Sequence, residues 1–320
     1  MKNSLFSFLF LFVLVACGTS QKAVDAPTTV PKSPTESWVP TSDDNSLLWE
    51  IRGAGLSQPS YLFGTIHMIT KDDFFLSDST IAAFKASDKV VFEIDMNEMN
   101  DPAILFSLIT QAMMADGITL KDLVSAEDYK LVDAHFTKMG LPMYLLDRVK
   151  PMFLAMMASG DLSGDELQSG EIKSYEMEFM KMAEVKNKAV GGLETLAYQM
   201  SVFDSIPYAE QATMLVDAIK SEDQGTDEFT EMIRLYKTQN IAEMYNMFKT
   251  DPDSPSNFES VLLTNRNQNW IPVMEKIASE QSTFFAVGAG HLGGEDGVIA
   301  LMRKAGYTLR PIFQAQAGAN

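Results

Sequence analysis

Two apolar runs that each end in Gly-x-x-His constrain the fold more than any other feature of this sequence. The first lies in Ser60–Ile69 (SYLFGTIHMI) and contains His67, and the second, Thr283–His291 (TFFAVGAGH), ends at His291. Short apolar runs bounded by glycine are typical of buried β-strands, so each pattern predicts a strand that delivers an imidazole to the edge of a sheet. The chain holds three histidines, and two of them share this context.

The N-terminal segment is typical of targeting and not of a fold. Residues 1–16 combine Lys2 with an apolar run too short to span a bilayer, which predicts a signal peptide. Leu14–Cys17 (LVAC) resembles the lipobox of bacterial lipoproteins, in which the cysteine is lipidated. We therefore predict a lipid on Cys17, followed by a flexible tether over residues 17–45 that is rich in Ser, Thr and Pro. A plain signal peptide with an incidental cysteine is the alternative.

Charge and cysteine content exclude several classes of protein. A formal net charge of −18 argues against nucleic-acid partners and against electrostatic binding to anionic lipid. We therefore expect membrane attachment through the N-terminal lipid alone, and a place in the cell envelope at the outer membrane or the periplasmic face. A single cysteine excludes internal disulfides, so the fold must depend on a hydrophobic core. The oligomeric state does not follow from the sequence.

Apolar periodicity predicts one α/β domain over residues 46–313. Strand patterns lie toward both ends of the chain, whereas helical spacing dominates the middle. We expect a central sheet built from the N- and C-terminal segments, a helical middle that forms a cap, and a tail over residues 314–320. The predicted strands are 46–53, 61–67, 89–96, a short strand within 187–195, 283–288 and 307–313; the predicted helices are 80–86, several within 102–184, 195–205, 209–221, 227–238, 241–250, 262–280 and 295–305.

Carboxylates accompany the two histidine motifs. Glu93 and Asp95 lie two residues apart on a predicted strand and so share one face, and Glu194 ends another. Acidic groups on a buried strand are costly unless they are paired or bound to a cation. Imidazoles and carboxylates together can hold a divalent cation with an open position, which lowers the pKa of bound water and polarises a carbonyl group. The glycines of the motifs would let the backbone approach a substrate or metal closely.

These motifs resemble those of the TraB/GumN family, which is related to the Tiki metalloproteases of animals. The resemblance runs from about Trp49 to Pro311, nearly the whole chain after the tether. Several further short matches occur in the same order and spacing. The matching segments are Ser60–Met68, Phe92–Asp95, Gly192–Thr195, Phe203–Pro207, Arg266–Asn267, Gly288–His291 and Gly297–Pro311.

The resemblance implies a metal-dependent protease that uses two Gly-x-x-His motifs and a glutamate. It assigns His67 and His291 as metal ligands, and Glu93 and Glu194 as a third ligand and a general base in either order. Such a mixed nitrogen and oxygen set suits manganese, cobalt, iron or zinc. The wider relatives imply an α/β core like that of erythromycin esterase and ChaN.

Each assignment has a structural alternative. Histidines at strand ends are often hydrogen-bonded packing residues, and Glu93 or Glu194 could instead satisfy a helix N-terminus. Arg266 could bind a substrate carboxylate or stabilise an oxyanion, or it could form a structural salt bridge. Asp95 could orient a metal ligand. His135 lies in a helical stretch without a companion motif and is expected to be a surface or packing residue.

The leading hypothesis is a lipid-anchored, metal-dependent hydrolase that acts on peptides or proteins outside the cytoplasm. The alternative is a non-catalytic lipoprotein that sequesters peptides, because TraB-like relatives are associated with restraining peptide pheromone signalling. Haem or iron capture, by analogy with ChaN, is a third interpretation that so few histidines disfavour. The leading hypothesis requires His67 and His291 to meet at a common cavity lined by acidic side chains.

Overall fold

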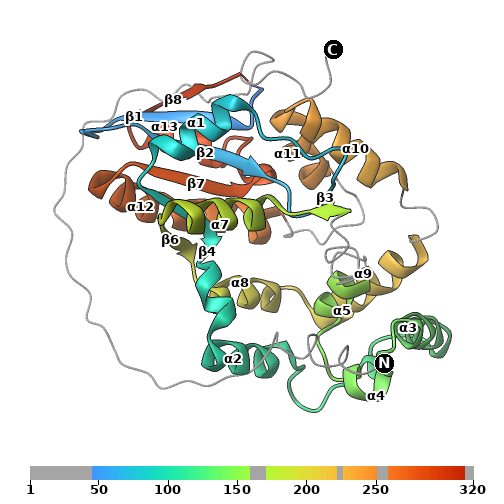
Figure 1. Cartoon of the computed structure of the whole chain (residues 1–320). Coiled ribbons are helices and arrows are strands. Elements are labelled where there is room, and N and C mark those ends of the chain that lie inside the picture. Colours follow the sequence, from blue (N-terminus) through green and yellow to red (C-terminus); the bar gives the residue numbers. More distant parts are fainter. Residues whose placement is uncertain (1–44, 159–170, 222–225, 251–258, 314–320) are drawn as a thin grey trace.

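A computed structural model of the protein describes residues 45–158, 171–221, 226–250 and 259–313 (Figure 1). The predicted signal peptide, the predicted lipidation site at Cys17, the predicted tether up to residue 44 and the predicted tail over 314–320 lie outside these residues. Within the described ranges, no helix is both long and apolar enough to cross a membrane.

A six-stranded sheet forms the centre of the domain, in the order β6-β4-β7-β2-β1-β8. The strands β1 and β2 form the predicted antiparallel hairpin, and β8 lies antiparallel beside β1. The strands β2, β7, β4 and β6 run parallel, so their carboxyl ends share one edge of the sheet. The bounds are β1 Leu48–Gly53, β2 Ser60–Thr65, β4 Lys89–Ile94, β6 Ala189–Glu194, β7 Thr283–Gly288 and β8 Tyr307–Pro311.

Helices cover both faces of this sheet, which explains why its parallel strands are so apolar. In β7, five of the six residues are buried. Figure 1 shows α1 (Asp78–Ala86) and α7 (Tyr175–Lys186) in front of the sheet and α12 (Asn265–Glu280) behind it. On the front face, rings from both helices pack on rings from β2 and β7, with centroids 5.0 to 6.0 Å apart. These rings belong to Phe63, Phe84, Phe179 and Phe284.

The strand β7 lies between β2 and β4 although it belongs to the C-terminal part of the chain. Its register pairs Thr65 with Gly288, so the two Gly-x-x-His motifs leave the sheet side by side. A Cβ atom on Gly64 would lie 2.6 Å from Leu292 Cδ1 and 3.1 Å from Ala289 Cα. Glycine is therefore required at position 64 because it permits close packing of one motif on the other. The close approach of the backbone to a substrate or metal, which was predicted for it, does not explain this glycine.

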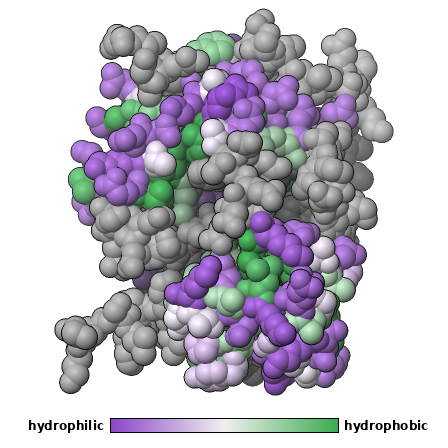
Figure 2. Space-filling view, turned by 90° about the vertical axis from the view of Figure 1, so that its right-hand side faces the viewer, coloured by the Kyte–Doolittle hydropathy of each residue, from purple (hydrophilic) through white to green (hydrophobic). Residues whose placement is uncertain are grey.

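The helical middle forms two further apolar clusters beside the sheet, as the predicted cap requires (Figure 1). The larger cluster includes Phe136, Leu154 and Leu215, and the smaller one includes Leu105 and Leu196. The helices that form these clusters are α2 Pro102–Ala112, α3 Ala126–Lys138, α4 Met143–Leu146, α5 Pro151–Ala158, α8 Leu196–Val202 and α9 Tyr208–Ser221. On the face of the molecule at the right of Figure 1, hydrophilic residues cover most of the coloured surface (Figure 2).

Two features differ from the prediction. The sheet is not built from the terminal segments alone, because β6 comes from the middle of the chain and forms one edge. A second, two-stranded sheet pairs β3 (Ile69–Thr70) with β5 (Ile172–Lys173). These strands were not predicted, because each is only two residues long and too short to show an apolar period. The other helices are α10 Thr226–Lys237, α11 Ile241–Thr250 and α13 Val298–Lys304. The short 3-10 helices are η2 Met96–Asn100, η3 Leu120–Asp122, η4 Phe203–Ser205 and η6 Ala289–His291, and η5 Ser260–Thr264 is a π-helical segment that leads into α12.

Candidate functional site

The carboxyl ends of the four parallel strands bring the predicted site residues to one edge of the sheet. Glu93 lies one residue before the end of β4, and Glu194 is the last residue of β6. His67 follows β2 by two residues, and His291 ends the η6 turn after β7. Ligands of open α/β sheets bind outside this edge, so the position favours a functional site.

Glu93, Glu194, Arg266 and His291 form one buried cluster, in which each side chain is at most 10 % exposed. Arg266, on α12, donates through Nη2 to Glu93 Oε2 and, at 2.7 Å, to Glu194 Oε1. Its Nε donates to Glu194 Oε1 at 3.0 Å, and its Nη1 lies 3.1 Å from His291 Nε2. The structural salt bridge considered for Arg266 is therefore present, and it joins both glutamates.

Three further groups complete the hydrogen bonding of the two carboxylates. The Gly288 N–H donates to Glu93 Oε1 at 2.8 Å, and Trp270 Nε1 donates to Glu194 Oε2 at 2.7 Å. Gln199, on α8, donates to Glu93 Oε2 at 3.0 Å and to Glu194 Oε1 at 3.2 Å. Every oxygen of both carboxylates thus accepts a hydrogen bond, which is what burial of two acids requires. Gln199 was not among the predicted site residues, because its only signal is its place in the helix after Glu194.

His291 is held through both ring nitrogens. Asn267 donates through Nδ2 to the Asp296 carbonyl at 2.8 Å, so its Oδ1 faces His291 Nδ1 at 2.6 Å. This orientation assigns the ring proton to Nδ1 and leaves Nε2 to accept from Arg266. The ring also packs on Trp270, with centroids 4.4 Å apart. Burial lowers the pKa of His291 to about 3, so the imidazole is neutral at ordinary pH.

The two buried glutamates differ in how readily they take up a proton. Burial opposes ionisation of Glu93, but the charge of Arg266 and the hydrogen bond from the Gly288 N–H outweigh burial and hold the pKa of Glu93 well below its usual range. For Glu194 burial outweighs Arg266 and Trp270, so its pKa is raised. Glu194 is therefore the first of the two to be protonated as the pH falls. Environments that push two carboxyl pKa values apart are typical of sites with distinct acid and base roles.

His67 lies outside the buried cluster and forms a second unit with Glu176, which we call the His67–Glu176 pair. His67 Nδ1 lies 3.1 Å from Glu176 Oε1, and Thr65 Oγ1 donates to the same oxygen at 2.7 Å. The His67 side chain is 75 % exposed, whereas that of Glu176 is 14 % exposed. The charge of Glu176 and its hydrogen bond raise the pKa of His67 to about 9. Glu176 was not among the predicted site residues, because its only signal is its place in the first turn of a helix.

Four of the five predicted site residues therefore lie in the buried cluster. The fifth, His67, lies outside it. Among the described contacts, His67 makes no hydrogen bond to the buried cluster, although the charges of Glu93 and Arg266 act on it. Asp95 does not orient a ligand, because its carboxylate caps η2 by accepting from Asn97 N at 2.9 Å. His135 is buried in α3, in agreement with the packing role considered for it.

The predicted metal ligands do not fit an ion as they lie here. In the part of the chain that the structure describes, no three His, Cys, Asp or Glu side chains are grouped so that they could hold a metal. Arg266 donates to both buried glutamates and faces His291 Nε2, so its guanidinium takes the lone pairs that a cation would use. The fourth predicted ligand, His67, is bonded to Glu176 instead.

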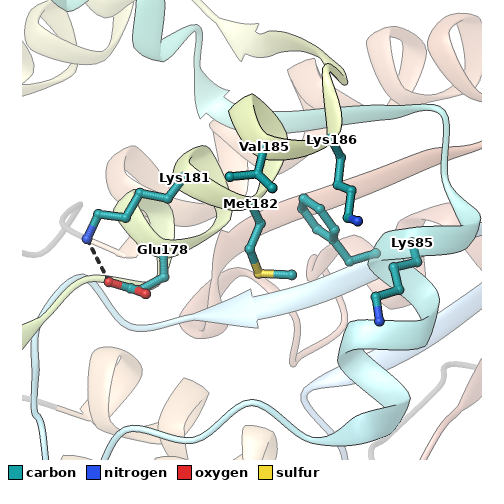
Figure 3. Close-up of a pocket in the computed structure, with 7 residues that line it drawn as sticks. Lys85, Glu178, Lys181, Met182, Val185 and Lys186 are labelled. Carbon is teal, nitrogen blue, oxygen red and sulfur yellow. Dashed lines mark hydrogen bonds and ion pairs between the residues drawn. The ribbon is translucent and has the colours of Figure 1, made fainter.

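An apolar groove between α1 and α7 contains none of these site residues (Figure 3). Phe84, Met182 and Val185 form its floor, and lysines surround it. Glu178 in this groove pairs with Lys181 at 2.8 Å. The groove extends toward the end of α7 opposite to Glu176, so it is not an extension of the candidate site.

Comparison with known proteins gives the chain a family. A sequence model of the TraB/PrgY/gumN family matches residues 47–311. Metalloprotease TIKI1 of Danio rerio is 23 % identical over 321 residues, which cover 84 % of this chain and 63 % of that protein. Metalloprotease TIKI1 of Homo sapiens is 22 % identical over 336 residues, with 86 % of this chain and 65 % of that protein covered.

A more distant animal relative, the metalloprotease TIKI homolog of Nematostella vectensis, is 21 % identical over 88 % of this chain and 72 % of its own length. The chain spans a little under two thirds of the Danio rerio and Homo sapiens proteins. No solved structure matches the chain, so the expected likeness to erythromycin esterase and ChaN stays a prediction. The match over residues 47–311 shows that the chain belongs to the TraB/PrgY/gumN family.

Proposed function

We propose that this protein is a hydrolase that cleaves peptides or proteins at the carboxyl edge of its parallel strands. One observation carries the proposal: the two Gly-x-x-His motifs end adjacent parallel strands, beside an ionised buried cluster. An exposed imidazole at this edge is accessible to a substrate. The similarity to proteins named metalloprotease supports a peptide bond as the target.

In this proposal His67 is the group that touches the substrate. Its ring is charged below a pKa of about 9, so it carries a proton at neutral pH. An imidazolium at the edge of the sheet can protonate a leaving amine or stabilise a developing oxyanion. The buried cluster supports this edge with a fixed arrangement of charges, because each of its members is hydrogen-bonded to another.

The names of the relatives also suggest a divalent cation, with manganese, cobalt or zinc as the candidates. Such an ion would compete with Arg266 for the lone pairs of His291, Glu93 and Glu194. The proposed role of His67 therefore depends only on side chains of the protein. Metal content after dialysis, measured by atomic emission, tests this part: about one ion per chain supports metal dependence, and none contradicts it.

We further propose that a lipid on Cys17 holds the protein in the cell envelope, at the outer membrane or the periplasmic face. The lipobox-like Leu14–Cys17 supports this location. Labelling with a clickable fatty acid in a bacterial host is expected to mark the wild-type protein and to leave Cys17→Ala unmarked. Equal labelling of both proteins contradicts the anchor.

Peptide sequestration without cleavage is the second candidate function. The observation that favours it is the complete hydrogen bonding of Glu93 and Glu194 within the protein, which leaves neither carboxylate free to act on a substrate. A protein of this kind would bind a peptide at the same edge and release it unchanged.

Turnover of a peptide library distinguishes the two functions. Wild-type protein, His67→Ala and the control variant His135→Gln are incubated with the library, with and without manganese, and the products are identified by mass spectrometry. Cleavage by the wild type and the control, but not by His67→Ala, supports the hydrolase. Retention of intact peptides without products supports sequestration, and equal cleavage by all three proteins contradicts the assigned site.

A further inference from the structure

The carboxylate of Glu176 connects two segments that lie far apart in the sequence. Its Oε1 accepts from Thr65 Oγ1 at 2.7 Å and faces His67 Nδ1 at 3.1 Å. Its Oε2 accepts from Ser174 Oγ at 2.9 Å. Three contacts from two segments of the chain fix the plane of the carboxylate, so the imidazole that it binds has a preferred direction.

Burial shows that this contact is more than a surface ion pair. Only 14 % of the Glu176 side chain is exposed, and burial of a carboxylate without a partner is costly. The contact also favours the charged form of the exposed partner, His67, because the carboxylate raises the pKa of that ring to about 9. A carboxylate placed beneath an exposed ring is the arrangement that orients a reactive imidazole.

A role in capping α7 does not account for Glu176. Ser174 is the N-cap residue of this helix and accepts from Met177 N through its side chain. The Ser174 hydroxyl also donates to Glu176 Oε2, which leaves Oε1 to serve Thr65 and His67. Oε1 of Glu176 therefore contacts the histidine motif, which a role within α7 alone does not require.

Glu176 Oε1 is a hydrogen-bond acceptor, because Thr65 donates to it. The contact between this oxygen and His67 Nδ1 therefore requires a proton on Nδ1. The other ring nitrogen, Nε2, is then the one available to a substrate. We propose that Glu176, together with Thr65, is a positioning residue that holds His67 by Nδ1 and presents Nε2 at the edge of the sheet. This inference rests on the proposed function only in assigning His67 to the substrate.

The first test is kinetic and uses the peptide cleaved most rapidly in the library. Glu176→Ala is expected to lower kcat about 10- to 100-fold with KM changed less than about twofold, as is typical when the partner of a reactive histidine is lost. Glu176→Gln, which keeps an acceptor, is expected to recover part of this loss. A loss that appears in KM and not in kcat, or one that Glu176→Gln does not recover at all, contradicts the inference.

A matched control lies on the same helix. Glu178 pairs with Lys173 at 3.2 Å and with Lys181 at 2.8 Å, and it does not contact His67. Glu178→Ala is expected to leave kcat within about twofold of the wild type. Circular dichroism and urea unfolding of all variants separate a loss of positioning from a loss of folding.

The second test does not depend on turnover. Long-range proton–nitrogen spectra of the folded, uniformly labelled protein report which nitrogen of a neutral ring carries the proton. Above pH 9, His67 is expected to be protonated on Nδ1 in the wild type, Glu178→Ala and Glu176→Gln, and mainly on Nε2 in Glu176→Ala. An Nε2 proton in the wild type, or no change in Glu176→Ala, overturns the inference. If the wild type cleaves no peptide, the hydrolase proposal fails, while these spectra still decide the role of Glu176.

Discussion

The two Gly-x-x-His motifs occupy equivalent places on adjacent strands, yet their histidines have opposite environments. His291 is buried, neutral and bonded through both nitrogens, and its pKa is lowered to about 3. His67 is mostly exposed and bonded through Nδ1 to Glu176, and its pKa is raised to about 9. The helix α12, which carries Arg266, Asn267 and Trp270, covers one ring, whereas only the first turn of α7 supports the other. The motif therefore determines where a histidine lies, and the covering helix determines its chemistry.

Removal of Arg266 has the largest expected effect on the buried side of this comparison. Arg266→Met would leave Glu93 and Glu194 buried together without their cation, which is expected to lower the free energy of unfolding by about 3–5 kcal/mol. Urea unfolding measures this change. The control, Arg52→Ala, breaks an exposed pair with Glu50 and is expected to cost less than about 1 kcal/mol. Similar losses for the two variants contradict the account of the buried cluster.

A methyl group at Gly64 tests the packing of one motif on the other. The new Cβ atom of Gly64→Ala would lie 2.6 Å from Leu292 Cδ1, so the motifs must separate or Leu292 must move. The expected loss is about 1–3 kcal/mol in the free energy of unfolding, the usual range for overpacking. Thermal and urea unfolding check this value. A variant as stable as the wild type shows that the contact is not tight.

The pH dependence of stability sharpens the difference between the rings. The pKa of His67 rises from 6.5 to about 9 on folding, so its stabilising contribution is complete below pH 6.5 and is lost as the pH rises through 9. The pKa of His291 falls from 6.5 to about 3, so below pH 6.5 the unfolded chain takes up a proton that the folded chain does not. This histidine therefore lowers stability as the pH falls from 6.5 toward 3.

Urea unfolding of the wild type and His67→Gln between pH 6 and 10 isolates the exposed ring. The stability difference between the two proteins is expected to be constant below pH 6.5 and to shrink between pH 6.5 and 9. A difference that grows over this interval has the wrong sign for a histidine paired with a carboxylate. Glu176→Gln is expected to lose the same alkaline dependence.

Loss of the Thr65 hydroxyl has the smallest expected effect. Thr65→Val removes one hydrogen bond to Glu176 Oε1 and keeps the side-chain shape, so a loss of about 1 kcal/mol is expected. Urea unfolding at pH 7 measures it. A loss as large as that of Arg266→Met would show that the His67–Glu176 pair is as interdependent as the buried cluster.

Local pattern was sufficient to predict most of the elements and their order. The strand 283–288 and the helix 241–250 have the expected bounds, because apolar residues with a clear period end at Gly288 and at Thr250. The parallel pairing of β2 with β7 brings the two histidine motifs to the same edge of the sheet. The expected meeting of His67 and His291 at one cavity is not seen, because His67 is exposed and paired with Glu176 whereas His291 is buried beside Arg266.

The partners of the site residues were harder to predict. Glu176 and His67 are 109 positions apart, and a first-turn glutamate on a helix has many ordinary explanations. Arg266 was considered both as a substrate contact and as a salt bridge, and only the packing of α12 shows that it joins the two glutamates. The local sequence reports which face of an element is buried, but not which distant side chain it meets there.

A proton titration of the histidine ring resonances by NMR tests the central claim most directly. Single replacements assign the three signals to His67, His135 and His291. The account predicts that the His67 ring titrates near pH 9 and that the His291 ring stays neutral down to about pH 3. If both rings titrated together near their ordinary pKa of 6.5, the division between an exposed, charged histidine and a buried, neutral one would be wrong.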